Sequence, residues 1–168
     1  MSNVKKLMMQ AAGGDPVNIE SIFSVTPYVG NGSSGQTITT GVDISTEGGL
    51  ILFKNRSNGG HSAGFDPQKY PNGNYWVYFN EFYGAQNIGE NIFGATTTGF
   101  SFAGGLGNSG NSSYNASSNK YISYSFRKAP KFFDAITFTG DGQDGRVISH
   151  SLGQVPGMIA IKAVSASE

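Results

Sequence analysis

The residues able to do chemistry in this chain are few and far apart. Its only histidines are His61, in a Gly/Ser-rich loop, and His150, which lies between Ser149 and Ser151. A Ser-His-Asp site is defined by the geometry of its members rather than by one residue type. We therefore expect both histidines to be exposed loop residues, and we predict no catalytic residue.

Two groups of carboxylates offer other chemistry. The stretch DGQDG, residues 141–145, has the start of a calcium loop, but the bidentate glutamate that such a loop needs does not follow. Asp66, Glu81 and Glu90 are the candidates for glycoside hydrolysis, which requires two carboxyl groups about 5–9.5 Å apart across a cleft. We predict a turn at 141–145, no metal and no cofactor, and we rank a glycan-cleaving enzyme last among the functions considered.

A segment suited to docking lies at the start of the chain, in residues 1–20. It contains two lysines followed by three apolar residues: Lys5, Lys6, Leu7, Met8 and Met9. Its helix-compatible stretch is broken at residues 13–16 (GGDP) and is short, since even helices of about 12–15 residues are marginal alone. We predict an arm that docks on a larger particle through these residues, with a frayed terminus as the alternative.

The densest aromatic stretch is NYWVYFN, residues 74–80, with Tyr83 close behind. Tyr75, Trp76, Tyr78 and Tyr83 are our candidates for contacts with a host glycan or a sister subunit, because aromatic rings combine contact area with a polar group. The alternative is that alternate members of this strand fill the core of the domain.

The amino-acid composition indicates which secondary structure carries these residues. Glycine accounts for 25 of 168 residues and aromatics for 12%, which favours many turns joined by β-strands. The formal net charge is zero and cysteine is absent, so we expect no nucleic-acid partner and no thiolate metal site. No apolar run approaches the roughly 20 residues that span a membrane, and we expect no membrane insertion.

One phrase occurs twice in the chain. Residues 28–42 read YVGNGSSGQTITTGV and residues 138–152 read FTGDGQDGRVISHSL, at an offset of 110. The following GGLILFK (48–54) matches PGMIAIK (156–162) at an offset of 108. We predict an all-β fold: an arm (1–20), a jelly-roll-like β-sandwich domain (21–129) whose first phrase is a hairpin, and the opening strands of a second repeat (130–168). We expect the natural chain to continue past Glu168.

These phrases, with KKLMM near the start, GGLILFKNRS and YSFRKAPKFFD (124–134), resemble a family of phage virion proteins. These are the large repeat-built tail-fibre or appendage proteins of marine and cyanobacterial phages. The resemblance covers nearly the whole chain except for the aromatic region 65–93, and it transfers no catalytic residue. It implies a non-enzymatic structural protein of the virion, attached through its N-terminal region and contributing to host adsorption. Its expected partners are other virion proteins and copies of itself, a homotrimer being favoured. The alternatives are a carbohydrate-binding module for host surface glycan and a capsid decoration protein.

Overall fold

A computed structural model describes residues 18–57, 62–73, 75–81, 84–87, 93–102 and 114–164. Nearly all of its regular structure is β, which confirms the all-β prediction. The elements are α2 (Ile19–Ile22), β1 (Phe23–Val29), β2 (Thr37–Thr39), β3 (Gly49–Asn55), β4 (Ser62–Phe65), β5 (Tyr75–Tyr78), β6 (Ala85–Asn87), β7 (Phe93–Thr96), β8 (Gly99–Phe102) and β9 (Lys120–Arg127).

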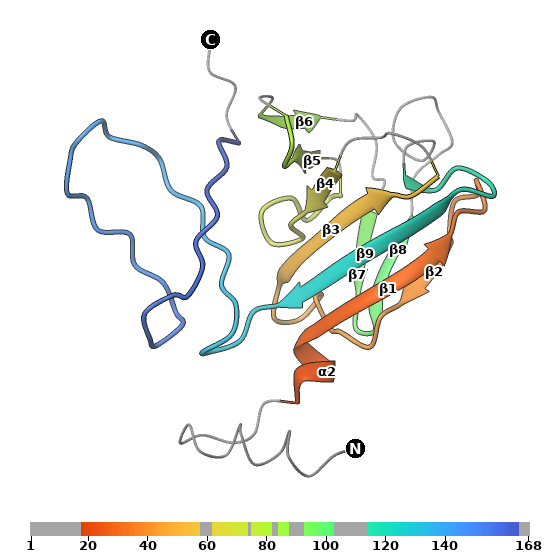
Figure 1. Cartoon of the computed structure of the whole chain (residues 1–168), viewed down its shortest axis with the longest axis horizontal. Coiled ribbons are helices and arrows are strands. Elements are labelled where there is room, and N and C mark those ends of the chain that lie inside the picture. The colour runs from red at the N-terminus through yellow and green to blue at the C-terminus, as the bar shows by residue number, and fades with distance from the viewer. Residues whose placement is uncertain are drawn as a thin grey trace.

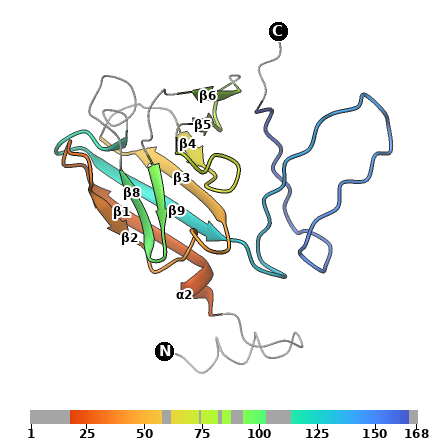
Figure 2. The same ribbon diagram turned by 180° about the vertical axis from the view of Figure 1, so that it is seen from behind.

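The described strands form two antiparallel sheets that face each other (Figures 1 and 2). The larger sheet has the order β1-β9-β3-β4-β5-β6, and the smaller has the order β2-β8-β7. One aromatic core lies between them. The ring of Phe53, on β3, lies 4.9 Å from that of Phe93 and 5.2 Å from that of Phe100, both on the smaller sheet. The unit is therefore sandwich-like.

Strand β3 shows how the sequence selects the inner face of a sheet. Side chains alternate between the faces of a strand, and this strand buries every second residue. Ile51 and Phe53 are completely buried in the core, whereas Leu52 lies on the outer face and remains partly exposed. Because the run is apolar on both sides, the outer face of the larger sheet keeps an apolar character as well.

The first phrase is not the hairpin that its sequence predicts. Strand β1 pairs with β9, and β2 pairs with β8 of the other sheet, so residues 30–36 cross between the two sheets. The loop bonds to the segment before β9 instead of closing a hairpin. The amide of Gly30 donates to the carbonyl of Asn119 (2.9 Å), and that of Gly32 donates to the carbonyl of Asn115 (2.8 Å). The sequence predicts a turn here and the turn is present. The predicted pairing of the two strands that flank it is wrong.

Strand β9 also differs from expectation in its place. The alternation of residues 121–126 predicts a strand that closes the domain, and the structure inserts that strand between β1 and β3. All seven residues of β1 and all seven of β3 have a register partner on β9. The last strand of the unit is thus an interior strand of the larger sheet, next to the edge strand β1.

One expected strand is a hairpin. The sequence of residues 95–102 predicts a single strand interrupted by Gly99, whereas β7 and β8 run antiparallel on either side of Thr97 and Thr98. The carbonyl of Thr98 accepts hydrogen bonds from the amides of Thr40 (2.8 Å) and Gly41 (3.0 Å). This turn therefore joins the hairpin to the chain that follows β2.

Residues 134–164, which we call the C-terminal segment, contain neither strand nor helix. The expected opening strands of a second repeat are therefore not formed in the structure. Figures 1 and 2 show the segment as an open loop that extends beside the two sheets.

Candidate functional site

Asp66, a carboxylate considered for catalysis, and His150 serve local structure. Asp66 Oδ1 accepts the backbone amides of Gln68 (2.9 Å) and Lys69 (3.0 Å), which caps the turn after β4. His150 Nδ1 accepts the amide of Leu152 at 3.3 Å. His61 and Glu90 lie outside the described residues. Within the described ranges, no group of three or more His, Cys, Asp or Glu side chains could hold a metal ion.

One serine motif escaped the sequence reasoning. Residues 60–64 read GHSAG, which fits the Gly-x-Ser-x-Gly elbow of many hydrolases. That elbow places its serine on a sharp turn from a strand into a helix. Here Ser62 is the first residue of β4, and its amide donates to Asn80 Oδ1 (2.8 Å). The chain continues from Ser62 as an antiparallel strand, so the motif lacks the geometry of a nucleophile.

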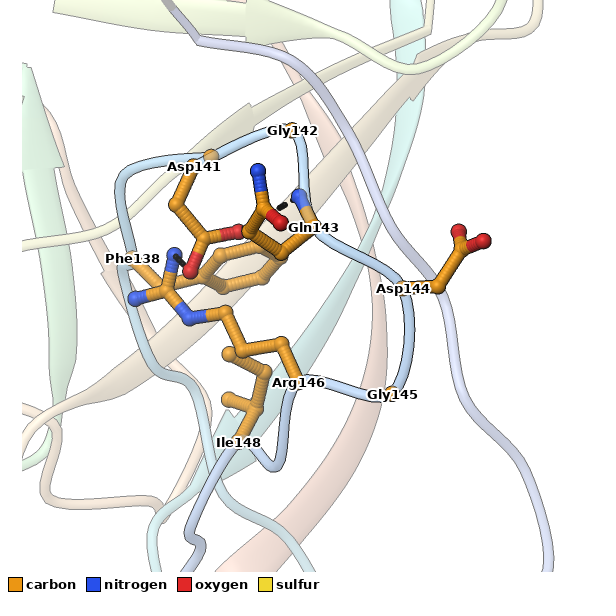
Figure 3. A pocket seen from close by; sticks show the side chains of 9 residues that line it. Phe138, Asp141, Gly142, Gln143, Asp144, Gly145, Arg146 and Ile148 are labelled. Atoms are coloured by element: carbon orange, nitrogen blue, oxygen red, sulfur yellow. Dashed lines mark hydrogen bonds and ion pairs between the residues drawn. The ribbon is translucent and has the colours of Figure 1, made fainter.

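A hollow of about 360 Å³ lies inside the loop at residues 138–148 (Figure 3). One of its two acidic residues is already engaged: Asp141 Oδ1 accepts the amide of Gln143 (3.1 Å), and Oδ2 forms an ion pair with Arg146 (3.3 Å). The guanidinium of Arg146 also lies 5.8 Å from the ring centroid of Phe138 and donates to the carbonyl of Thr139. These contacts brace an exposed turn, as the turn interpretation of residues 141–145 expects.

The two copies of the phrase form the same backbone turn. In the first copy, Asn31 Oδ1 accepts the amide two residues later at 2.8 Å, as Asp141 does in the second at 3.1 Å. Glycines follow with positive φ at equivalent places: 70° and 84° at Gly32 and Gly35, and 71° and 76° at Gly142 and Gly145. Because positive φ favours glycine, the conformation of the turn is enough to explain these glycines, and no ligand is needed to account for them.

The two copies differ in burial. Ile51 is 0% exposed, whereas Ile159, its equivalent at the offset of 108, is 73% exposed. Phe53 is 1% exposed and its equivalent Ile161 is 77% exposed. Further exposed large apolar side chains in the segment are Ile136, Phe138, Val147, Val155 and Met158. Exposed apolar residues in this number are typical of an interaction site, and the C-terminal segment is our candidate functional site.

The segment is fastened at its start by a junction of aromatic and charged residues. The ring of Phe133 stacks on that of Phe126, on β9, at 5.2 Å. Lys128 Nζ lies 3.3 Å from Asp134 Oδ1, and Asp134 Oδ2 accepts the amide (2.8 Å) and hydroxyl (2.9 Å) of Ser151. Partial burial raises the pKa of Asp134, but the bonds from Ser151 and the charge of Lys128 outweigh it and lower that pKa overall.

The far end of the segment is fastened too. The amide of Ala85, on β6, donates to the carbonyl of Val164 at 2.9 Å, and Lys162 Nζ donates to the carbonyl of Glu81. The exposed apolar residues thus lie on a loop held at both ends against the sheet domain.

The aromatic residues that the sequence suggested for glycan or subunit contacts do not form one exposed surface: Trp76 is buried. Trp76 is 3% exposed and packs edge-on against Tyr114 at 5.2 Å, so its indole lies in the core. Tyr78 is half-buried beside Trp76, and Tyr75 stacks on Tyr70 at 4.8 Å. Tyr83 lies outside the described residues, as do Lys5, Lys6, Leu7, Met8 and Met9. A sugar-stacking role for Trp76 would require the core to open.

A buried polar network, which the sequence analysis does not predict, lies just before β9. Asn115 is 0% exposed and its amide donates to the carbonyl of Ser33 (2.9 Å), while its Oδ1 accepts the amide of Asn31 (3.0 Å). Tyr28 Oη donates to the carbonyl of Tyr114 at 2.8 Å. Burial raises the pKa of both tyrosines. In the sequence, Tyr114 is isolated in a run rich in serine and asparagine, and this isolated aromatic residue was the signal for a buried contact.

The fold and the site together define a sandwich-like all-β protein with an apolar segment beside its larger sheet. Comparisons with family models, with curated proteins and with solved structures found no match. Among the described residues, no helix is long and apolar enough to span a membrane.

Proposed function

We propose that this chain is a non-enzymatic structural component of a bacteriophage particle, a tail fibre or tail appendage that takes part in host adsorption. In this proposal residues 21–129 form one jelly-roll-like β-sandwich of a repeated series, and residues 130–168 belong to the next repeat. The resemblance of the sequence to repeat-built virion proteins motivates the proposal.

The observation that carries the proposal is the contrast between equivalent positions of the two copies. Side chains that fill the core of the first copy have apolar counterparts in the second copy that are exposed. Covering them is favourable, since burying apolar surface contributes roughly 25 cal/mol per Å². A segment of this kind is suited to assembly, and assembly is the work of a virion component.

The described side chains also support a structural role over an enzymatic one. Asp66 and Asp141 hold turns, and Ser62 begins a strand. We propose that the chain works with other virion proteins and with copies of itself, a trimer being favoured, because strands with apolar residues on both faces gain from burial between subunits. Docking through Lys5 to Met9 remains part of the proposal.

The test is immunogold labelling of purified particles with polyclonal antibody raised against the whole purified chain. Labelling along tail appendages supports the proposal, and labelling over the capsid identifies a decoration protein instead. Antibody adsorbed with the purified chain is the control. Particles that carry no label, in lysates where the chain is detected by mass spectrometry, contradict a virion role. Light scattering on the purified chain measures its oligomeric state, and a monomer that is stable to dilution counts against the trimer.

A further inference from the structure

The first copy of the repeated phrase contains a chemically reactive pair of residues, Asn31 and Gly32. In an Asn–Gly sequence the backbone nitrogen of the glycine can attack the side-chain carbonyl carbon (Cγ) of the asparagine, because glycine has no Cβ to shield that nitrogen. Such pairs occur at 31–32, 58–59 and 72–73. The pair at 58–59 lies outside the described residues, so the structure places the other two.

Both reacting groups of the first pair are held by Asn115. The amide of Gly32 donates to the backbone carbonyl of Asn115 at 2.8 Å. Asn31 Oδ1 accepts the amide of Ser33 (2.8 Å) and Asn115 Nδ2 (3.3 Å). The amide of Asn31 donates to Asn115 Oδ1 (3.0 Å) and to Gln36 Oε1 (3.1 Å). Asn115 is 0% exposed, whereas Asn31 is exposed to solvent. The hydrogen bonds, and not the exclusion of water, therefore restrain this pair.

The segment at residues 115–119, which supplies these bonds, is itself fastened to the loop. The amide of Gly30 donates to the carbonyl of Asn119 (2.9 Å), and the amide of Ser118 donates back to the carbonyl of Gly30 (2.9 Å). A Cβ added at Gly30 would lie 2.3 Å from the carbonyl oxygen of Ala116, so the two backbones are in direct contact. The reactive glycine is therefore freed only when this segment moves away from the loop.

We propose that Asn31 is a deamidation site that its contacts with Asn115 keep closed, and that it reacts when the segment moves away. The Gly32 nitrogen then loses its proton to water and attacks Cγ of Asn31. A C–N bond forms, the bond from Cγ to Nδ2 breaks, and ammonia leaves with a proton from water. Water opens the resulting five-membered imide at either carbonyl, which leaves aspartate or isoaspartate. One water is consumed and one ammonia is released, with no oxidation or reduction. The inference concerns the chain alone and does not rest on the proposed virion role.

The second copy has a less reactive residue in the same turn, which is open there. Asp141 occupies the place of Asn31 at the offset of 110, in an exposed loop (Figure 3). A Cβ added at Gly142 would meet nothing within 4 Å, whereas one added at Gly32 would lie 3.4 Å from Ser117. A carboxylate is a poor target for a nucleophile because it is negatively charged. The amide side chain thus occurs in the copy whose turn is covered, and the carboxylate in the copy whose turn is open.

The pair Asn72–Gly73 provides an internal reference. The amide of Gly73 donates to the carbonyl of Tyr70, three residues earlier, at 2.9 Å. This bond belongs to a local turn and does not involve Asn115. Disturbing the contacts of Asn115 should therefore raise the rate of deamidation at Asn31 and leave the rate at Asn72 unchanged, whereas unfolding of the whole unit should raise both.

The experiment incubates the purified full chain at mildly alkaline pH and follows the loss of both amides by peptide mass spectrometry, with fragmentation that separates aspartate from isoaspartate. We expect Asn31 to react at least about tenfold more slowly in the folded parent than in guanidinium chloride, since several hydrogen bonds are lost on unfolding. Asn115→Ala should raise the rate at Asn31 by about fivefold, the effect of losing roughly one hydrogen bond, and leave Asn72 unchanged. Ser117→Ala, at an exposed position of the same segment, is the matched control and should change neither rate.

Three results would overturn the proposal: equal rates at Asn31 in the folded and the unfolded chain, an unchanged rate at Asn31 in Asn115→Ala, or equal acceleration at Asn31 and Asn72 in that variant. The last would mean that unfolding of the whole unit controls the reaction. If Asn115→Ala does not fold, Gln36→Ala removes one acceptor of the Asn31 amide and should raise the rate at Asn31 alone, by about twofold. An unchanged rate at Asn31 in Gln36→Ala would then overturn the proposal. Because the isolated chain is used, the outcome is independent of particle labelling.

Discussion

The same substitution at two equivalent positions tests the difference between the copies. Ile51 and Ile159 are both isoleucines and align at the offset of 108. Ile51 is 0% exposed between the sheets, whereas Ile159 is 73% exposed. We predict that Ile51→Ala destabilises the chain strongly and that Ile159→Ala leaves its stability almost unchanged. Because the chemical change is identical, each variant is the control for the other.

The magnitudes follow from burial. Truncating a buried isoleucine to alanine costs about 2–5 kcal/mol, because transfer free energy is lost and a cavity remains. With only about a quarter of its side chain covered, Ile159 retains a corresponding part of the 1.5–3 kcal/mol that full burial provides, or about 0.5 kcal/mol. For a domain of this size 1 kcal/mol shifts Tm by about 2–4 °C. Ile51→Ala should therefore lower Tm by about 4–20 °C, and Ile159→Ala by about 1–2 °C.

The assay is thermal and urea unfolding followed by near-ultraviolet circular dichroism, which reports the packing of the aromatic core. If Ile51→Ala fails to fold, Ile51→Val provides the same comparison at about 0.5–1.5 kcal/mol. Equal losses for Ile51→Ala and Ile159→Ala would refute the reasoning, since they would mean that the second arm is packed in the isolated chain. A loss at neither position would refute the assignment of Ile51 to the core.

Three further predictions follow from the close contacts. Gly30→Ala should cost about 1–3 kcal/mol by urea unfolding, because its Cβ would lie 2.3 Å from a backbone oxygen, whereas Gly140→Ala, with nothing within 4 Å, should change stability by less than about 0.5 kcal/mol. Asn115→Ala should cost about 1–3 kcal/mol in the same assay by leaving buried partners unbonded, and a neutral result would contradict the network. The pKa of Asp134 is lowered in the folded chain, so its contribution is complete above the unfolded value of about 3.9 and is lost as pH falls below it. Asp134→Asn should therefore weaken the acid dependence of stability between pH 5 and 2.5, and an unchanged dependence would show that the pair with Lys128 does not form in solution.

Local patterns in the sequence predicted several strands but not their order. The apolar run at 50–53, the aromatic run at 75–78 and the alternation at 121–126 all lie in strands. Pairing depends on contacts between residues far apart in the chain, such as that between Tyr28 and Tyr114, 86 residues away. The loop at Gly30 shows the limit clearly: its glycines and asparagine predict a turn, but they do not determine whether the next strand returns to the same sheet.

The candidate site was predicted in part by the repeated phrase. The offset identified which positions of the two copies correspond, and the shared turn at residues 31–35 and 141–145 agrees with it. Sequence could not indicate that residues equivalent to Ile51 and Phe53 would be exposed, because both copies have apolar residues there. For Trp76 the sequence left two alternatives open, a contact with a glycan or subunit and a place in the core. The packing of Tyr114 against its indole shows that it lies in the core.

The position of β9 makes the larger sheet depend on contacts between residues far apart in the chain. Within the described chain, β1 pairs with β9 alone, and β3 is joined to β1 only through β9. The hydroxyl of Ser123 bonds to the carbonyl of Thr26, 97 residues earlier, so the β1-β9-β3 part of the larger sheet forms only when most of the unit has been made. Closing such long loops costs entropy before their contacts form, which slows folding. Among the described residues, the second copy has counterparts of β1, β2 and β3 but no strand of the β9 type, and its apolar side chains are exposed where those of the first copy are buried.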